Sequence, residues 1–241
     1  MAGHARRVVS LVPSVTEALR SWGVEPVACT RFCEQPDLPH VGGTKDPDVA
    51  AVVALAPDLV VVCDEENRAE DAAALAGAGL QVHSCSPRTA VDVARAMAAL
   101  AEAVGVVPPP DRTGGPLPVL EPLGCRAFVP IWRRPWMSLA DDTYGASLLA
   151  AIGVANVVAE LAAPEGAGDR YPEVDLAAVA ALAPDVVLAP SEPYAFRPKH
   201  LGELADVAPV LEVDGQDLFW WGVRTPAAAQ RLHAAVAAAL G

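Results

Sequence analysis

Val49-Ala-Ala-Val-Val-Ala-Leu-Ala-Pro-Asp58 recurs as Leu176-Ala-Ala-Val-Ala-Ala-Leu-Ala-Pro-Asp185, and the second copy begins 127 residues after the first. A second pair, Thr16–Val24 and Ala146–Val154, recurs at an offset of 130. Alanine-rich helices resemble one another by composition, so a single match would be weak evidence. Two matches in the same order at nearly equal offsets predict two α/β lobes of related build.

Short valine-rich runs alternate with alanine-rich helical segments along the chain. Strands are expected at Val8–Val12, Val27–Cys29, Leu59–Cys63, Gln81–Ser84, Arg126–Ile131, Val186–Ala189 and Val210–Val213. Helices are expected in the first half at Ser14–Trp22, Pro47–Leu55, Asn67–Ala76 and Thr89–Val104. Ser14 with Glu17 predicts a capping box, and Thr89 with Asp92 a weaker one. This alternation predicts an α/β fold of two Rossmann-like lobes with parallel sheets and a cleft between them.

The stretch 106–124 is rich in proline and glycine and cannot form a continuous helix. We therefore predict an N-terminal lobe over residues 1–105, an inter-lobe linker over 106–124 and a C-terminal lobe over 125–241. The connection between the lobes is expected to be helical, proline-rich or both.

Charge and composition exclude several classes of partner. The 241 residues include 17 Lys plus Arg and 30 Asp plus Glu, a formal net charge of −13, and 53% are hydrophobic. Nucleic acid and anionic membranes attract basic patches, so neither is expected as a partner. No apolar run approaches the roughly 18–20 residues of a membrane span. The absence of an apolar signal segment near Met1 and the odd number of cysteines, five, predict a cytoplasmic protein with reduced thiols.

Aromatic residues make up only 5% of the chain, and most of them follow predicted strands. Loops at the carboxyl ends of parallel strands are where open α/β sheets bind ligands. Aromatic side chains gathered there predict a cleft for a flat, partly apolar molecule, although any one of them could instead pack within its own lobe. The candidates are Phe32, Trp132, Trp136, Tyr171, Tyr194, Phe196, Trp220 and Trp221.

Arg133 and Arg134 lie between two tryptophans and suit an anionic ligand group such as a carboxylate or phosphate. The alternative is that one of them pairs with a neighbouring aspartate, Asp141 or Asp142. Glu192 could balance one of these arginines across the cleft, and Cys33 could face the cleft as a thiol or a soft ligand.

Recognisable catalytic motifs are absent from the sequence. None of the five histidines lies in a nucleophile or zinc motif, and Cys29-x-x-x-Cys33 is too isolated to assign as a metal site. We assign no catalytic residue and no metal ligand. An enzyme that has reused the cleft, with Cys33, Glu192 or Tyr194 as the reacting group, stays open as an alternative.

Several motifs together resemble the helical-backbone substrate-binding proteins, the class III group that serves ABC importers of vitamin B12, haem and iron-siderophores. The N-terminal motifs are RVVSLVPSVTE at 7–17, RFCEQP at 31–36, VGGT at 41–44 and ALAPDLVV at 54–61. The C-terminal ones are the segment 130–137, YPEVD at 171–175, ALAPDVV at 181–187 and an aromatic loop before Thr225-Pro226.

The resemblance implies a ligand held between two lobes by aromatic side chains, here Phe32, Trp132, Tyr171 and Trp220. It implies a corrinoid, haem or iron chelate as cargo rather than as a resident cofactor. We therefore expect a solute-binding module for a cobalamin-like, haem-like or other anionic metal-chelate ligand.

Three departures from the family pattern modify that expectation. Family members are exported, whereas no leader is recognised here. The family's permease-docking glutamates correspond to Ala50 and Ala177, so docking to a permease is doubtful. The family's long backbone helix falls on the proline-rich stretch 106–124, and Thr89–Val104 could replace it in shortened form. An importer component whose leader was trimmed stays open as a further alternative.

Overall fold

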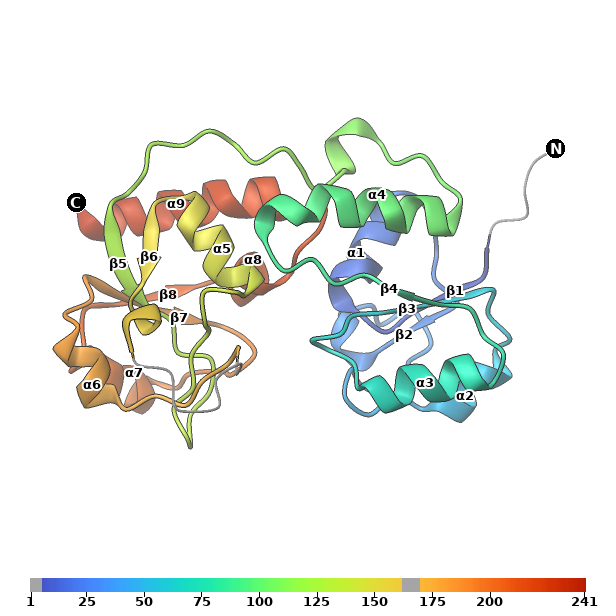
Figure 1. Cartoon of the computed structure of the whole chain (residues 1–241), viewed down its shortest axis with the longest axis horizontal. Coiled ribbons are helices and arrows are strands. Elements are labelled where there is room, and N and C mark those ends of the chain that lie inside the picture. The colour runs from blue at the N-terminus through green and yellow to red at the C-terminus, as the bar shows by residue number, and fades with distance from the viewer. Residues whose placement is uncertain (1–5, 162–169) are drawn as a thin grey trace. The chain divides into compact units, whose positions relative to one another are not determined.

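The computed structural model describes residues 6–161 and 170–241 and consists of two compact units (Figure 1). The first comprises Met1–Pro87 with Asp92–Gly115, and the second Arg88–Val91 with Pro116–Gly241. The proline-rich stretch 106–124 is thus divided, its first ten residues grouping with the first unit and the rest with the second. In the described part of the chain, no helix is both long and apolar enough to cross a membrane.

A four-stranded parallel sheet in the order β2-β1-β3-β4 forms the centre of the first unit. The strands are β1 (Val8–Ser10), β2 (Ala28–Cys29), β3 (Leu59–Val62) and β4 (Val82–Ser84). The helices are α1 (Pro13–Ser21), α2 (Val49–Ala54), α3 (Ala69–Gly77) and α4 (Val93–Val104), with 3-10 turns η1 (Arg31–Cys33), η2 (Ala90–Asp92) and η3 (Pro110–Arg112). In Figure 1, α2 and α3 lie on one side of this sheet and α1 and α4 on the other.

The second unit repeats this topology with a parallel sheet in the order β6-β5-β7-β8. Its strands are β5 (Cys125–Phe128), β6 (Val154–Asn156), β7 (Val186–Pro190) and β8 (Val210–Val213). Its helices are α5 (Tyr144–Ala151), α6 (Leu176–Ala181), α7 (Pro198–Ala205), α8 (Gly215–Phe219) and α9 (Thr225–Leu240), with the 3-10 turn η4 (Val157–Glu160). The predicted α/β class with two parallel sheets is confirmed.

Apolar side chains on both faces of the strands hold the helices on the sheets. In the first unit, Val9 and Val60 are fully buried and pack with Val52 of α2 and Leu75 of α3. A strand covered on both faces reads as a continuous apolar run rather than an alternating one, as Leu59–Val62 does.

The sequence repeat corresponds to the same local structure in both units. Asp58 and Asp185 each accept a hydrogen bond at 2.8 Å from a backbone N–H, that of Arg7 or Arg126. Each arginine directly precedes the residue that pairs with the start of the next strand, Leu59 of β3 or Val186 of β7. The two arginines each donate to a carbonyl at the end of the repeated helix, Arg7 to Leu55 O and Arg126 to Leu182 O, also at 2.8 Å. The repeat therefore encodes how a helix is joined to the next strand.

Two predicted helix starts are wrong. Helix α1 begins at Pro13, because proline at the first helical position needs no hydrogen-bond partner, and Ser14 falls inside the first turn without capping it. Helix α4 begins only at Val93, after the 3-10 turn η2, and no side chain caps it. It has twelve residues.

Candidate functional site

The segment from Trp132 to Met137 forms a tight loop after β5. Met137 N donates to Trp132 O at 3.1 Å, and Ile131 N donates to Met137 O at 2.9 Å. Arg134, at the tip, has a φ of +74°. These bonds hold the two tryptophans of the loop close to the end of β5.

Four aromatic rings of the second unit gather beside this loop, and we call them the aromatic surface: Trp132, Trp136, Tyr194 and Phe196. Trp132 meets Tyr194 edge-on with ring centroids 5.2 Å apart, and Trp136 stacks on Phe196 at 6.0 Å. Tyr194 and Phe196 are 5.0 Å apart. The rings converge because they follow β5 and β7, which are neighbours in a parallel sheet and end at the same edge. Trp132 is 44% exposed, so a large apolar ring is available to a ligand.

Arg133 is engaged within its own unit. Its guanidinium donates to both carboxylate oxygens of Glu203 on α7, the shortest bond being 2.7 Å, and lies 5.6 Å from the ring centroid of Trp136. These bonds hold the pKa of Glu203 below its usual value. The partner of Arg133 is thus Glu203 and not a neighbouring aspartate, since Asp142 pairs with Arg170 and Asp141 accepts from Asn156.

Arg134 differs from its neighbour. It is exposed, and within residues 6–161 and 170–241 its side chain makes no hydrogen bond and no ion pair. Of the two arginines in the loop, Arg134 is therefore the one whose charge is available to an anionic group.

His200 lies beneath the aromatic surface and was not predicted. It is 4% exposed, its ring centroid is 5.8 Å from that of Tyr194, and its Nδ1 accepts from Arg197 N at 3.2 Å. Burial first, and then the nearby Arg133 charge, lower the pKa of His200. With Nδ1 accepting, Nε2 carries the proton of the neutral ring. Its only sequence signal was its place one helical turn before Glu203 on an amphipathic helix.

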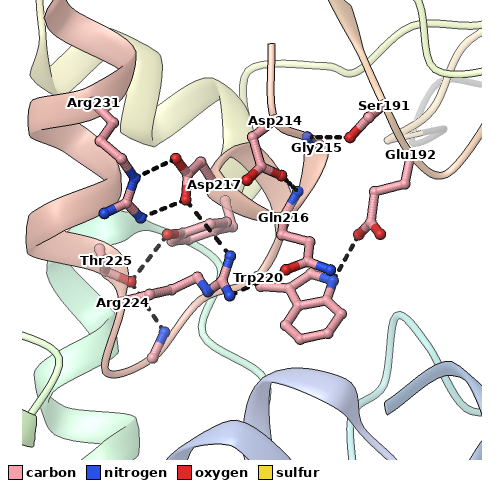
Figure 2. A network of polar contacts seen from close by, with 12 residues as sticks. Ser191, Glu192, Asp214, Gly215, Gln216, Asp217, Trp220, Arg224, Thr225 and Arg231 are labelled. Atoms are coloured by element: carbon pink, nitrogen blue, oxygen red, sulfur yellow. Dashed lines mark hydrogen bonds and ion pairs between the residues drawn. The ribbon is translucent and has the colours of Figure 1, made fainter. Parts of the chain in front are cut away.

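Trp220 belongs to a second set of contacts (Figure 2). Its indole Nε1 donates to Glu192 Oε1 at 2.6 Å, and the Arg224 guanidinium lies 5.1 Å from its ring centroid. A Cβ at Gly215 would lie 2.6 Å from Glu192 N, so glycine permits the close approach of these two segments. Glu192 therefore orients the Trp220 indole.

A buried carboxylate, also missed by sequence reasoning, anchors this second set (Figure 2). Asp217 is 3% exposed and accepts from Arg231 of α9 at 2.6 and 2.7 Å, while Arg224 lies 3.6 Å away. The contacts join α8 to α9. Asp217 and Arg231 are fourteen positions apart, so no local sequence pattern indicates that they pair.

Phe32 and Cys33 are neighbours in the first unit but differ in exposure. Phe32 is 50% exposed, with the Arg31 guanidinium 4.7 Å from its ring centroid and paired with Asp46 at 2.9 Å. Cys33 is 1% exposed, and its sulfur lies 3.2 Å from the hydroxyls of Thr16 and Thr30. Cys33 thus offers no exposed thiol.

Of the remaining predicted residues, Trp221 is buried, with 4% exposure, whereas Tyr171 is half-buried before α6. In the described residues, no three or more His, Cys, Asp or Glu side chains form a group that could hold a metal ion.

Three aromatic rings share one arrangement, in which an arginine covers the ring and a carboxylate holds the arginine. The sets are Arg31–Phe32–Asp46, Arg133–Trp136–Glu203 and Arg224–Trp220–Asp217. In each set the carboxylate compensates the cation, so the arginine orients a ring rather than offering a free positive charge.

No known family model matches the sequence, and no curated protein sequence is similar to it. Solved structures, in contrast, match over the whole chain. The periplasmic vitamin B12 binding protein BtuF of Vibrio cholerae has a TM-score of 0.72 at 19% identity, with 98% of each chain covered. The chain shares its fold with the class III periplasmic binding proteins.

Two haem-binding relatives of this fold are equally similar. The periplasmic haem-binding protein RhuT from Roseiflexus sp. RS-1 has a TM-score of 0.76 at 18% identity, covering 99% of this chain and 100% of its own. The periplasmic haem-binding protein BhuT has a TM-score of 0.73 at 21% identity, with the same coverage. The resemblance expected from the sequence motifs is confirmed for the fold.

Proposed function

We propose that this protein is a solute-binding module for a flat, partly apolar metal chelate that carries a negative group, such as a haem-like or cobalamin-like molecule. In this proposal the ligand stacks against Trp132 and its neighbours in the aromatic surface, and Arg134 contacts the negative group. We also propose that the protein acts in the cytoplasm and does not deliver its ligand to a permease.

The exposed face of Trp132 carries the proposal. Trp132 is 44% exposed, so part of its apolar surface is in unfavourable contact with water. The edge-on contact with Tyr194 and the loop bonds around Met137 nevertheless hold the side chain in place. Fully burying such a ring recovers a few kcal/mol of transfer free energy. A planar conjugated macrocycle is a ligand class that can cover the exposed face of an indole.

Charge supports the anionic character of the ligand. The chain carries a formal net charge of −13, so a cationic ligand would be attracted almost anywhere on its surface. At the aromatic surface, by contrast, Arg133 is paired with Glu203, whereas Arg134 forms no ion pair with any of the described residues. One free guanidinium beside stacking rings suits a peripheral carboxylate or phosphate.

The proposal against permease delivery depends on two alanines. Ala50 and Ala177 are exposed in the first turns of α2 and α6. Each lies two residues after the residue that caps its helix, Asp48 or Asp175. The resemblance places docking glutamates at these two positions. Methyl groups there supply no charge with which a permease arginine could pair.

The decisive experiment is a titration of the purified chain with ferric haem and, separately, with cobalamin, followed by absorbance and by calorimetry. We expect a saturable complex with at least one of them, weakened at least about tenfold in Trp132→Ala, or roughly 1.4 kcal/mol. Arg134→Gln should weaken a ligand with free carboxylates and leave the ring contacts unchanged.

Trp22→Phe is the matched control, because Trp22 belongs to the first unit, donates to Arg112 O at 2.7 Å and is not one of the rings of the aromatic surface. Its affinity should equal that of the unmodified chain. Absence of binding to either chelate, or equal binding by Trp132→Ala, would overturn the proposal.

A further inference from the structure

Most positive side chains of this chain are engaged by other groups. They form ion pairs with carboxylates, as Arg133 does with Glu203, or donate to backbone carbonyls, as Arg7 does to Leu55. In the part of the chain that the structure describes, the Lys and Arg side chains with no ion pair and no hydrogen bond are those of Arg88, Arg134, Arg197 and Lys199. All of them are exposed, in a chain with a formal net charge of −13.

Arg134, Arg197 and Lys199 adjoin the aromatic surface, and we call them the cationic rim. Arg134 lies at the tip of the loop after β5. Arg197 directly follows Phe196 of the aromatic surface, and Lys199 is the second residue of α7. Because β5 and β7 pair in a parallel sheet, the segments that follow them meet at the same edge. Free positive charge is thus placed beside the stacking rings.

The charges of the rim act on the groups under the aromatic surface. Burial and then the Arg133 charge lower the pKa of His200, and the two rim cations at the start of α7 contribute to the same shift. The hydrogen bond from Arg133 holds the pKa of Glu203 below its usual value, and the Arg134 charge contributes to that shift. All three cations of the rim therefore lie within electrostatic reach of the first two turns of α7.

The carboxylates beside the rim do not cancel its charge. Both oxygens of Glu203 already accept from Arg133. The carboxylate of Glu173 is exposed beside the loop, since its backbone pairs with that of Met137. The three rim cations outnumber it, so an excess of positive charge remains for a ligand.

We propose that the cationic rim makes the aromatic surface selective for a chelate with more than one carboxylate, such as a ferric tetrapyrrole whose ring carries free acid side chains. This inference rests on the proposed function and specifies the class of its ligand. Separate guanidinium and ammonium groups pair with separate carboxylates at the edge of a ring that stacks on Trp132. Uncharged amides form no ion pair with these cations, so a corrinoid with an amide periphery should bind more weakly.

The gain from each carboxylate is modest, because the rim is exposed to solvent. An exposed ion pair changes an equilibrium constant by about two- to fivefold. If two such pairs form independently on one rigid ring, their effects multiply, and the diacid should be preferred over an uncharged ring by about four- to twenty-five-fold.

The test is a titration of the unmodified chain with ferric haem as its free diacid, its monomethyl ester and its dimethyl ester, in one mixed solvent. The three forms share the ring and the iron and differ only in the number of carboxylates. We expect the affinity to fall in that order by about two- to fivefold at each step. The preference for the diacid should shrink between about 0.02 and 0.5 M salt, because ions screen exposed charges.

Variants that remove the charges assign this preference to the rim. The triple variant Arg134→Gln, Arg197→Gln, Lys199→Gln should bind all three forms about as tightly as the unmodified chain binds the diester. Arg88→Gln is the matched control, because it removes an equally uncommitted cation that is not among the charges acting on His200 or Glu203. This control should keep the full preference. Circular dichroism verifies that both variants fold.

The possible outcomes separate this inference from the proposed function. If the unmodified chain binds the three forms equally while Trp132→Ala weakens them all, the inference is wrong and the proposed function stands. An unchanged preference in the triple variant, or its loss in Arg88→Gln, would also overturn the inference. If none of the three forms binds, the inference fails, and the proposed function fails with it only when cobalamin does not bind either.

Discussion

Removal of the Asp217 carboxylate should destabilise the second unit far more than removal of the exposed aspartate that caps the same helix. Asp217 is 3% exposed and receives two bonds from Arg231, at 2.6 and 2.7 Å. Arg224 lies 3.6 Å away with its side chain 16% exposed. Asp217→Ala would leave Arg224 largely buried without its counter-charge.

The magnitude follows from the burial of each partner. Breaking a buried ion pair by removing one member costs about 3–5 kcal/mol. The Arg231 side chain is 55% exposed and can return to solvent, and Gln216 still accepts from Arg224 at 3.1 Å. We therefore expect the lower end, about 3 kcal/mol, a large fraction of the roughly 5–15 kcal/mol that stabilises a typical domain.

Asp214→Ala is the matched control. Asp214 is exposed, precedes α8 and accepts from Gln216 N at 2.9 Å as its capping residue. Loss of such a cap costs about 1 kcal/mol. The two variants remove the same charge from positions three residues apart, so their difference isolates burial and pairing.

Tryptophan fluorescence during urea unfolding is a suitable assay, because one substitution makes it report on the second unit alone. Trp22 is the single tryptophan of the first unit, and Trp22→Phe removes it. The remaining tryptophans are Trp132, Trp136, Trp220 and Trp221. In that background Asp217→Ala should lower the midpoint by about 1–3 M urea, given slopes of roughly 1–3 kcal/mol/M. A shift no larger than that of Asp214→Ala would refute the reasoning.

Three further predictions concern single positions. Ala56 and Ala183 have φ of +45° and +50°, so Ala56→Gly and Ala183→Gly should each stabilise the protein by about 0.5–1 kcal/mol in urea unfolding, and a loss of stability would contradict this. Asn67, 5% exposed, accepts from Cys63 N and donates to two carbonyls; Asn67→Ala should cost about 2–4 kcal/mol, and a change under about 1 kcal/mol in thermal or urea unfolding would argue against it. Because the pKa of Cys33 is lowered to about 6, the folded state binds fewer protons than the unfolded state between about pH 6 and 9. The stability of the unmodified chain relative to Cys33→Ser should therefore rise with pH across that window, and a flat difference would show that Cys33 is protonated.

Much of the candidate aromatic surface could be predicted from the sequence, for a topological reason. Trp132 and Trp136 follow one predicted strand, and Tyr194 and Phe196 follow another. If both strands are neighbours in a parallel sheet, the four rings must meet at one edge, and they do. The ligand-binding roles of all the predicted residues stay predictions.

Side-chain pairing could not be predicted in the same way. Arg133 and Glu203 are seventy positions apart, and nothing local distinguishes Glu203 from other surface glutamates. Trp221 and Cys33 sit next to half-exposed aromatic residues in sequence but are buried. Neighbouring residues on an extended segment or a short turn point in different directions, so adjacency does not determine exposure.

By itself the sequence determined the repeat of helix and strand, and with it two parallel sheets. The recurrent Ala-Pro-Asp stretch is preceded directly by its capping aspartate, Asp48 or Asp175, and followed directly by β3 or β7, so its structure is local. Only the tertiary structure decided which side chains are buried and which charges are compensated, leaving Arg134 free and Arg133 bound. Those properties depend on distances between side chains far apart in sequence, and such distances exist only after the sheets have brought the loops together.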